Sequence, residues 1–391
     1  MSDRVLKLAE LVSAGMLEIG AGRPRSVGLD RFPLPILRVA DVMEGRIQQL
    51  DQVDAPMIRS DEMGSKTSRP GDVVLTAKGT VGRVAIMPSV GPVYAYSPQL
   101  CYFRAAVDGL LNSRYLYYWF KSEEFWGQAD ALKGQTDMAD FLSLSDVGSL
   151  KMRIPPLEEQ EAAINVLGSI DDKIAVNQRI IDLSEKLAEV SLSAAFDGRF
   201  ASLSSQAFVT MGSSPPGASY NKRAVGTPFY QGVRDFGARF PAKRVWTTAP
   251  VRMAGVRDTL VSVRAPVGRT NIANEEMCIG RGVASLRSRS GCPMTLFHQV
   301  RAARDAWAPF EAEGTVFGAV NKSQLEAVLV PMVRAEIVEE LERKLAVIEN
   351  RIAAALSENE ILAKTRNELL PLLMSGKVRV REAEEIVEGV V

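Results

Sequence analysis

The sequence predicts an α+β protein: two mixed α/β domains separated by two long helices packed as an antiparallel coiled coil, with an internal pseudo-two-fold. Three observations support this. A charged helical segment opened by proline occurs twice, at "IPPLEEQEAAI" (154–164) and at "VPMVRAEI" (330–337). Each follows a stretch rich in β-branched residues and turns. The chain of 391 residues is also too long for one hydrophobic core.

The first long helix is predicted over 158–196. The prolines at 155–156 hold the chain extended and end strand pairing, and proline is tolerated where a helix begins. Acidic side chains follow in the first turn, where the helix dipole favours them. Gly198 and Gly376 are predicted to end the two helices.

The two helices share a heptad pattern. At an offset of 178 residues, "IDDKI" falls on "IENRI", and apolar residues recur at alternating spacings of three and four. The predicted coiled-coil seam consists of Leu167, Ile170, Ile174, Asn177, Ile181, Leu345, Ile348, Ile352, Asn359 and Leu362. Each seam carries one asparagine, a residue that fixes register at some cost in stability. The simplest partner for each helix is therefore the other helix.

The segments before the helices also repeat. "DVVLTAKGTVGRVAI" at 72–86 matches "DTLVSVRAPVGRTNI" at 258–272, and both predict a β-hairpin around a glycine-containing turn. "PILRVADV" resembles "PFYQGVRDF" in the same order. The predicted parts are a first domain over 1–155, a central helix over 156–200, a second domain over 201–330, a distal helix over 331–380 and an acidic tail over 381–391.

Charge is segregated although the net charge is zero. Residues 201–330 hold 16 Lys and Arg against 8 Asp and Glu, whereas 156–200 hold 4 against 9 and 331–391 hold 9 against 12. A basic module between acidic helices fits a polyanionic partner that is reached by one surface. Chance clustering of solvated charge is the alternative.

The order of these motifs resembles one family. "IPPLEEQ" followed by "IDDKIAVNQ", "GSSPPGASYN" followed by "GTPFYQGVRDF", and "LLPLLMSGKV" are similar to type I restriction–modification specificity subunits over nearly the whole chain. The resemblance implies two target-recognition domains, each gripping one half of a bipartite double-stranded DNA site. It implies helices that set the spacing and dock two modification (methyltransferase) subunits, with restriction or motor subunits as further partners.

The resemblance also implies that this chain has no catalytic centre and holds no cofactor itself. S-adenosylmethionine, ATP and Mg belong to the partner subunits. The residues agree, because "SSPPGA" lacks the aromatic and the acid or amide of a base-clamping loop, and no GxxxxGK[ST] motif is present. His298 is the only histidine and the three cysteines form no CxxC pair, so no metal site is expected.

No apolar run reaches the length of a membrane span, and the charged start does not resemble a signal peptide, so a cytoplasmic protein is expected. DNA contacts should come from turn residues, where Arg and Lys reach phosphates or guanine and amides reach adenine. The candidates are Lys78, Arg83, Lys133, Gln135, Tyr220, Asn221, Lys222, Arg223, Arg264 and Arg269. For each one the alternative is an ordinary solvated side chain.

Two other functions stay open at this point. The helices could make the chain a coiled-coil scaffold that binds proteins without DNA sequence specificity. The chain could also be a stand-alone enzyme, which the missing motifs disfavour. The basic balance of residues 201–330 favours the DNA-specificity function.

Overall fold

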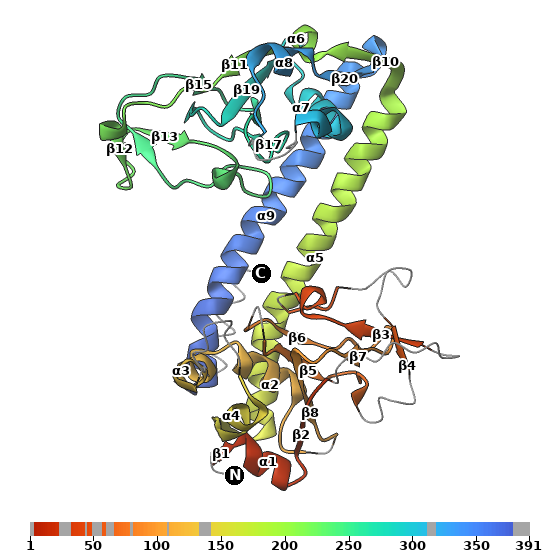
Figure 1. Ribbon diagram of the computed structural model, residues 1–391, viewed down its shortest axis with the longest axis vertical. Helices are drawn as coiled ribbons and strands as arrows, with labels where there is room; N and C mark the ends of the chain where they lie inside the picture. The colour runs from red at the N-terminus through yellow and green to blue at the C-terminus, as the bar shows by residue number, and fades with distance from the viewer. Residues whose placement is uncertain are drawn as a thin grey trace. The chain divides into compact units, whose positions relative to one another are not determined.

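Two long helices, α5 (Leu157–Ala195) and α9 (Val338–Met374), organise the chain. The computed structural model describes residues 4–22, 33–43, 45–48, 57–59, 66–78, 81–107, 109–132, 142–310 and 318–377. These residues form two units, and each unit contains one part of each long helix (Figure 1). Unit 1 comprises the described residues up to 175 and from 360 onward, and unit 2 comprises those from 176 to 359.

Unit 1 is a mixed α/β fold. Before α5 it contains β1 (Arg4–Lys7), α1 (Leu8–Ser13), β2 (Leu17–Ala21), β3 (Pro33–Leu37), η1 (Val39–Asp41), β4 (Met57–Arg59), β5 (Val73–Thr76), β6 (Val84–Ile86), β7 (Ala95–Tyr96), β8 (Leu100–Ala105), α2 (Ser113–Phe120), α3 (Glu123–Leu132), α4 (Leu144–Ser149) and β9 (Lys151–Ile154). One sheet has the order β2–β8–β5–β6, another the order β4–β3–β7, and β1 pairs with β9.

Unit 2 is also mixed α/β. Between the long helices it contains β10 (Phe196–Ser202), α6 (Leu203–Gln206), β11 (Ala207–Met211), η4 (Gly217–Ser219), β12 (Tyr220–Asn221), β13 (Thr227–Tyr230), η5 (Val233–Asp235), β14 (Trp246–Thr247), β15 (Met253–Ala254), β16 (Thr259–Ser262), β17 (Thr270–Ile272), β18 (Met277–Ile279), β19 (Val283–Ser288), α7 (Pro293–Ala302), η6 (Arg304–Phe310), α8 (Lys322–Ala327), β20 (Leu329–Val333) and η7 (Ala335–Ile337). Its sheets have the orders β11–β19–β16–β17 and β12–β14–β13–β18–β15, and β10 pairs with β20.

Both predicted hairpins are confirmed. β5 pairs antiparallel with β6, and β16 pairs antiparallel with β17. The turns are closed in the same way: the Thr76 hydroxyl accepts from the Arg83 backbone N–H at 2.9 Å, and the Ser262 hydroxyl accepts from the Arg269 N–H, also at 2.9 Å. In both units the strand preceding the short 3₁₀ turn is parallel to its neighbour, as β3 is to β7 and β13 to β18. The sequence repeat therefore corresponds to a shared strand order.

The helix ends differ from the sequence prediction at one site. α5 begins directly after the two prolines, and the carbonyl of Pro156 accepts from the Gln160 N–H at 3.0 Å. Gly376 lies just beyond α9 with a φ of 69°, which fits the predicted helix stop. The corresponding prediction for Gly198 is wrong. α5 ends at Ala195, and Gly198 lies inside β10, where the register with β20 shifts between Phe196 and Phe200.

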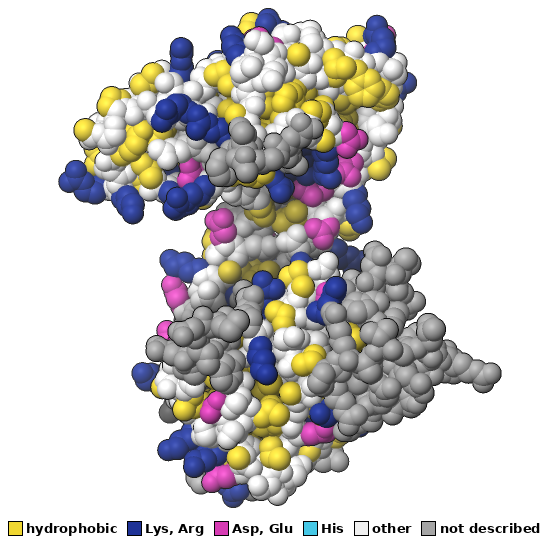
Figure 2. All heavy atoms as spheres, in the orientation of Figure 1, with side chains coloured by type: hydrophobic (Ala, Val, Ile, Leu, Met, Phe, Trp, Pro, Cys, Tyr) yellow, Lys and Arg dark blue, Asp and Glu magenta, His cyan; other side chains and the backbone are white. Residues whose placement is uncertain are grey.

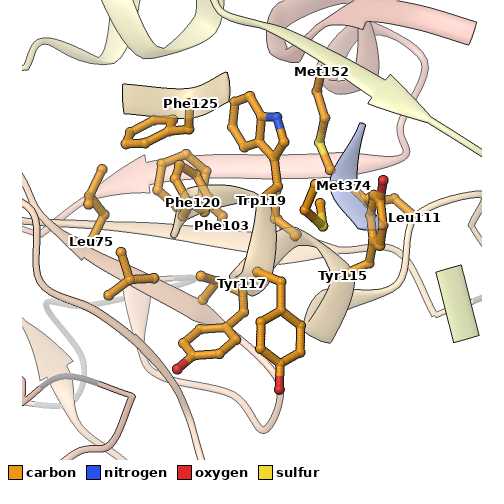
Figure 3. Packing of buried hydrophobic residues seen from close by; sticks show 14 of the residues in the cluster. Leu75, Phe103, Leu111, Tyr115, Tyr117, Trp119, Phe120, Phe125, Met152 and Met374 are labelled. Carbon is orange, nitrogen blue, oxygen red and sulfur yellow. The ribbon is translucent and has the colours of Figure 1, made fainter. Parts of the chain in front are cut away.

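The long helices are part of the hydrophobic core of unit 1. Helix α2 lies between the sheet and α5, and Trp119, Phe120 and Phe125 pack edge to face at ring-centroid distances of 4.9–5.2 Å (Figure 3). The same buried cluster contains Leu167 and Ile170 of α5. From α9 it takes the buried residues Leu362, Leu369, Leu370, Leu373 and Met374. Tyr118 of α2 also donates its hydroxyl to Asp171 of α5 at 2.8 Å.

Unit 2 repeats this arrangement with the other parts of the helices. Phe297 and Met294 of α7 are buried together with apolar residues from both α5 and α9. His298, also on α7, contacts Glu349 of α9 through Nε2 at 2.9 Å. Glu349 and Asp171 occupy matching positions in the sequence register of the two helices. In each unit a polar contact at this matching position joins helix α2 or α7 to a long helix.

Polar contacts show that α5 and α9 run in opposite directions. In unit 1, Arg366 of α9 binds Asp171 of α5 at 2.8 Å, and Arg153, just before α5, donates to the carbonyl of Met374. In unit 2, the Asn177 amide donates to Glu358 at 2.7 Å and to Asn359 at 3.1 Å.

Most residues of the predicted coiled-coil seam are buried. The buried ones are Leu167, Ile170, Asn177, Ile181, Leu345, Ile348, Ile352 and Leu362, whereas Ile174 and Asn359 are half-buried.

We predict that Ile352→Asp destabilises the chain by more than about 3 kcal/mol, because it places an unpaired carboxylate in the core of unit 2. Ile174→Asp should cost less, since that side chain is only half-buried. Val347→Asp is the control, because Val347 on the same helix is 68% exposed. Urea unfolding of the three variants measures the effect. Equal midpoints for Ile352→Asp and the parent would contradict this packing.

Candidate nucleic-acid interface

Unit 2 contains a basic groove of about 760 Å³. Its cationic side chains all lie exposed, and they come from four separate stretches of the chain: Lys222, Arg234, Arg244, Arg264 and Arg281. Asp235 is the carboxylate among the groove's lining residues. Figure 2 shows Lys and Arg side chains gathered over the part of unit 2 that carries β12 and β13. A concave surface of one sign raises the local concentration of oppositely charged ligands.

Backbone hydrogen bonds build this groove. After β13 the chain turns through η5, and the Asp235 carboxylate accepts from the Gln231 N–H at 2.8 Å. The turn between β18 and β19 then meets the same segment. The Gly280 N–H donates to the Tyr230 carbonyl at 2.8 Å, and the Gly282 N–H donates to the Gln231 carbonyl at 3.0 Å. Residues 50 positions apart are thereby fixed side by side.

Glycine is required at this junction. A Cβ on Gly282 would lie 2.4 Å from the carbonyl oxygen of Gln231. A Cβ on Gly212, at the start of the "GSSPPG" loop, would lie 2.2 Å from the carbonyl oxygen of Gly280. The obstructing atoms belong to the backbone, so they cannot move aside cheaply. Arg281 therefore lies in a tight turn between two glycines, and its own side chain is exposed.

The charges of the groove are mostly available to a ligand. Arg244 is partly engaged, since it donates to the Arg234 carbonyl at 3.3 Å and lies 4.0 Å from Asp235. Lys222, Arg234, Arg264 and Arg281 form no ion pair with any residue that the structure describes. Such a set of exposed cations is what a phosphate backbone requires.

A second hollow of about 800 Å³ shares the β16–β17 turn with the groove. This turn supplies Arg264 to the groove and Arg269 to the second hollow. The hollow is also lined by Arg301 and Arg304, and by the amide of Asn271. That amide is already used, because it donates to the carbonyls of Gly237 and Thr270.

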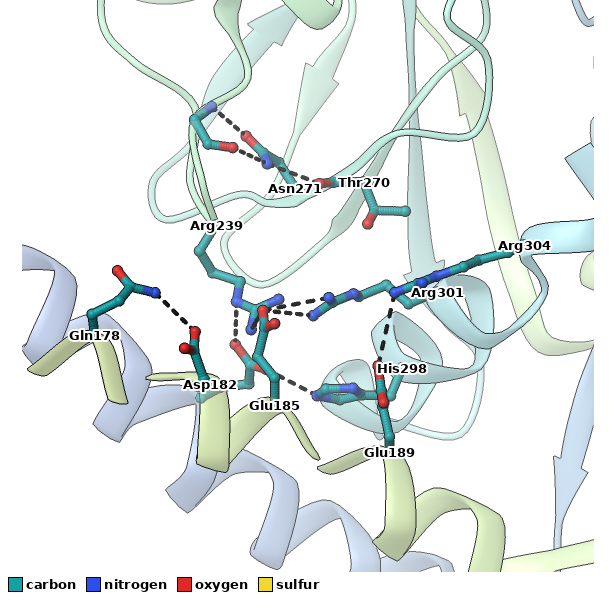
Figure 4. Close-up of polar contacts among 12 residues, drawn as sticks. Gln178, Asp182, Glu185, Glu189, Arg239, Thr270, Asn271, His298, Arg301 and Arg304 are labelled. Carbon is teal, nitrogen blue, oxygen red and sulfur yellow. Dashed lines mark hydrogen bonds and ion pairs between the residues drawn. The ribbon is translucent and has the colours of Figure 1, made fainter. Parts of the chain in front are cut away.

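A buried ion network anchors the second hollow to both long helices (Figure 4). Arg239 is 3% exposed, and its guanidinium lies 2.9 Å from Glu185 of α5 and 3.1 Å from Glu349 of α9. Glu349 also contacts His298, and Glu185 also pairs with Arg301 at 3.4 Å. Burial lowers the pKa of Arg239, while Glu349 and Glu185 act in the opposite direction. This network fixes the loop that connects η5 to β14, which carries Arg244 of the groove.

The structure places the predicted residues of unit 2 in different roles. Lys222 and Arg264 line the groove, and Arg269 lines the second hollow. Tyr220 is a packing residue, since its ring lies 4.9 Å from that of Phe229 and its hydroxyl donates to the Pro215 carbonyl. The predicted Asn221 closes its own turn by accepting from the N–H groups of residues 223 and 225. Arg223 is exposed and does not line the groove.

The predicted DNA-contacting residues of unit 1 are described only in part. Lys78 is exposed just after β5. Arg83 is half-buried, and its guanidinium donates to the Val42 carbonyl at 3.4 Å. Lys133 and Gln135 lie outside the described residues, as does the predicted acidic tail over 381–391. The turn that corresponds to Gly280–Gly282 reads Ser-Pro-Gln and carries no cation.

Three groove cations, Arg234, Arg244 and Arg281, were not predicted from the sequence. A local signal existed for Arg281, because the string "GRG" marks a tight turn with one displayed side chain. Arg234 lies within the repeated motif "QGVRDF", which predicts a repeated strand and turn but no role for this side chain. Their meeting in one groove depends on the parallel pairing of β13 with β18, for which the sequence carries no local pattern.

Other classes of site find no support in the described residues. No group of three or more His, Cys, Asp or Glu side chains in the described part of the chain could hold a metal ion. Cys101, Cys278 and Cys292 are buried free thiols. Within the same described residues, no helix combines the length and the apolar character that crossing a membrane demands.

Comparisons with known sequences find similarity to type I restriction specificity proteins. Residues 64–185 match the family described as type I restriction modification DNA specificity domain. A protein of Methanocaldococcus jannaschii, provisionally named type I restriction enzyme MjaX specificity subunit, is 24% identical over 379 residues, which are 90% of this chain and 89% of the relative.

One solved structure shares the fold of this chain. A type I restriction-modification system S subunit from M. genitalium has a TM-score of 0.62 at 14% identity, covering 95% of this chain and 96% of that chain. The HsdS subunit from Thermoanaerobacter tengcongensis is 24% identical and covers 96% of this chain and 97% of that chain, with a TM-score of 0.37. The first of these supports the same fold for both chains, and the second superposes too poorly to support an argument.

We predict that Glu349→Ala destabilises the chain by about 3–5 kcal/mol, because it leaves the buried Arg239 without its partner on α9. Glu349→Gln should cost less, since the amide still accepts hydrogen bonds. The control is Glu189→Ala, whose 3.8 Å pair with Arg304 lies on the surface and should contribute less than about 1 kcal/mol. Thermal and urea unfolding measure these changes. A Glu349→Ala variant as stable as the control would show that the network does not hold the loop.

Proposed function

We propose that this chain, which belongs to the family of type I restriction–modification specificity subunits, is the non-catalytic DNA-reading subunit of such a complex. The basic groove of unit 2 is the observation that carries the proposal. It presents five exposed cations against one carboxylate, and four of them have no ion-pair partner among the described residues. A surface of this kind suits DNA phosphates, with side chains left over to contact base edges.

Each domain is proposed to read one half of a bipartite site. The target-recognition domains are residues 1–155 and 201–330, and their matching strand orders support two readers of one design. The second domain supplies the basic groove. The charge of the first domain is balanced, so it is proposed to depend more on local contacts from turn residues such as Lys78.

The long helices are proposed to act as a spacer, with segments 156–200 and 331–380 packed as an antiparallel coiled coil and the whole chain following a pseudo-two-fold. The opposed directions of α5 and α9 within each unit support this arrangement. So does the pair of Asn177 with Asn359, because a polar pair at the seam of a coiled coil selects one register. A helix of fixed length between two readers defines how many base pairs separate the half-sites.

The modification subunits are proposed to dock on α5. Besides its buried seam, α5 carries a second apolar stripe at heptad spacing, formed by Val176, Ile180, Leu183, Leu187 and Val190. Four of these side chains are 48–65% exposed, which is unusual for a row of large apolar residues. An amphipathic helix of a methyltransferase subunit would cover such a row by the same packing that joins α5 to α9.

Catalysis is proposed to reside in partner subunits: S-adenosylmethionine would bind the methyltransferase subunits, and ATP and Mg would bind a restriction or motor subunit if one is present. The complex would act in the cytoplasm. The alternative, a coiled-coil scaffold without DNA specificity, leaves the basic groove without a purpose, whereas DNA reading accounts for both the groove and the helices.

A domain exchange tests the proposal. Residues 201–330 are replaced by the equivalent domain of a relative with a different target, and methylated sites are mapped by sequencing in cells that carry the matching methyltransferase subunit. We expect one half of the methylated sequence to change while the other half stays the same. The reciprocal exchange of residues 1–155 should change only the other half. A change in both halves at once would contradict independent readers, and a change in neither would contradict DNA reading by these domains.

Docking on α5 has its own test. The double variant Leu183→Glu, Leu187→Glu should abolish co-purification with the methyltransferase subunit, since it puts two charges into the proposed apolar contact. Asp182→Lys, a charge change at the exposed position directly before Leu183 but outside the stripe, is the control. Helical circular dichroism should match the parent, because all three side chains are exposed. Assembly of the double variant with parental affinity would place the docking surface elsewhere.

A further inference from the structure

Arg281 and Gln231 share one set of backbone hydrogen bonds, at the junction of the β13 end with the turn between β18 and β19. The Gly280 and Gly282 N–H groups on either side of Arg281 are bonded to carbonyls of the β13 end, and the Val283 N–H closes the turn onto Gly280 at 3.0 Å. The side chain of Arg281 itself is exposed and makes no hydrogen bond or ion pair with a described residue. A guanidinium on a fixed turn is a preorganised fork of donors.

Gln231 is fixed in the same junction. Its N–H donates to Asp235 at 2.8 Å, and its carbonyl accepts from the Gly282 N–H at 3.0 Å. Its amide group is exposed and has no hydrogen-bond partner among the described residues. An uncharged amide gains little electrostatic binding energy from a phosphate. It can, however, accept from N6 and donate to N7 of an adenine at the same time.

We propose that Arg281 and Gln231 are the base-reading pair of the second domain, Arg281 for a guanine and Gln231 for an adenine in a neighbouring base pair; this rests on the function proposed above. The backbone bond between residues 282 and 231 holds the two segments side by side, and Arg281 and Gln231 both line the groove. The remaining cations, among them Lys222 and Arg264, hold phosphates. The assignment follows from chemistry and rigidity: base edges demand planar partners in fixed positions, whereas a phosphate accepts any nearby cation.

The test uses the full chain in complex with its methyltransferase subunit. Methylome sequencing first defines the parental site. Binding and methylation are then measured on a duplex with that site and on duplexes in which each base pair is changed in turn. Arg281→Lys keeps the charge but loses the planar fork. We expect it to lower the preference at a single base pair by roughly 5- to 150-fold, with the salt dependence of binding unchanged.

Gln231→Ala should relax the preference at the neighbouring base pair by a similar factor, again without a change in salt dependence. Arg264→Ala is the contrasting variant. It should weaken binding to every duplex alike and lower the slope of log K against log salt by about 1. All three side chains are exposed, so the thermal midpoints should match that of the parent.

The outcomes separate the two proposals. Parental base preferences in Arg281→Lys, or a uniform loss across all duplexes, would overturn the reading role while leaving DNA binding by the domain intact. Relaxation at the same position by Arg264→Ala would also overturn it, because phosphate and base contacts would then not be divided as described. If the parental complex itself shows no sequence preference, the proposed function fails, and the reading pair fails with it.

Discussion

The packing of α5 against α9 is the constraint on which the rest of the structure depends. Each unit has one buried cluster that includes residues of both helices. In unit 1, Leu167 and Ile170 share one buried cluster with the aromatic side chains of α2, and in unit 2 Ile348 and Ile352 share one with Phe297 of α7. A helix that contributes to a domain core at each end cannot shift along its axis without opening both clusters. The helices are therefore part of the hydrophobic core of each unit.

Much of this architecture can be predicted from the sequence because it follows short periodicities. Apolar residues at spacings of three and four predict the helices, and alternating β-branched residues around Gly82 and Gly268 predict the hairpins. The failure at Gly198 is instructive. A glycine near a helix end fits a helix stop and a β-bulge equally well, and the pairing of β10 with the distant β20 decides between them. Local patterns do not contain that information.

The candidate site was predicted only in part, for a related reason. Lys222 and Arg264 were identified because they lie in turns of a basic segment, but Tyr220 and Asn221 of the same segment are occupied in packing and turn closure. Arg281 was missed because its relation to the end of β13 arises from strand pairing between segments 50 residues apart. The zero net charge of the chain was equally uninformative, because the cations of the groove are balanced by carboxylates of the long helices.

The glycines at the groove junction carry a consequence for how such a protein can change over generations. The backbone geometry is secured by residues that have no side chain, such as Gly212 and Gly282, while the displayed side chain between Gly280 and Gly282 supports nothing else in the described fold. Substitution at position 281 therefore costs little stability, whereas substitution of Gly282 or Gly212 costs a great deal. On the proposed base reading, folding and selectivity depend on different residues, so new preferences can be sampled one mutation at a time without passing through unfolded intermediates.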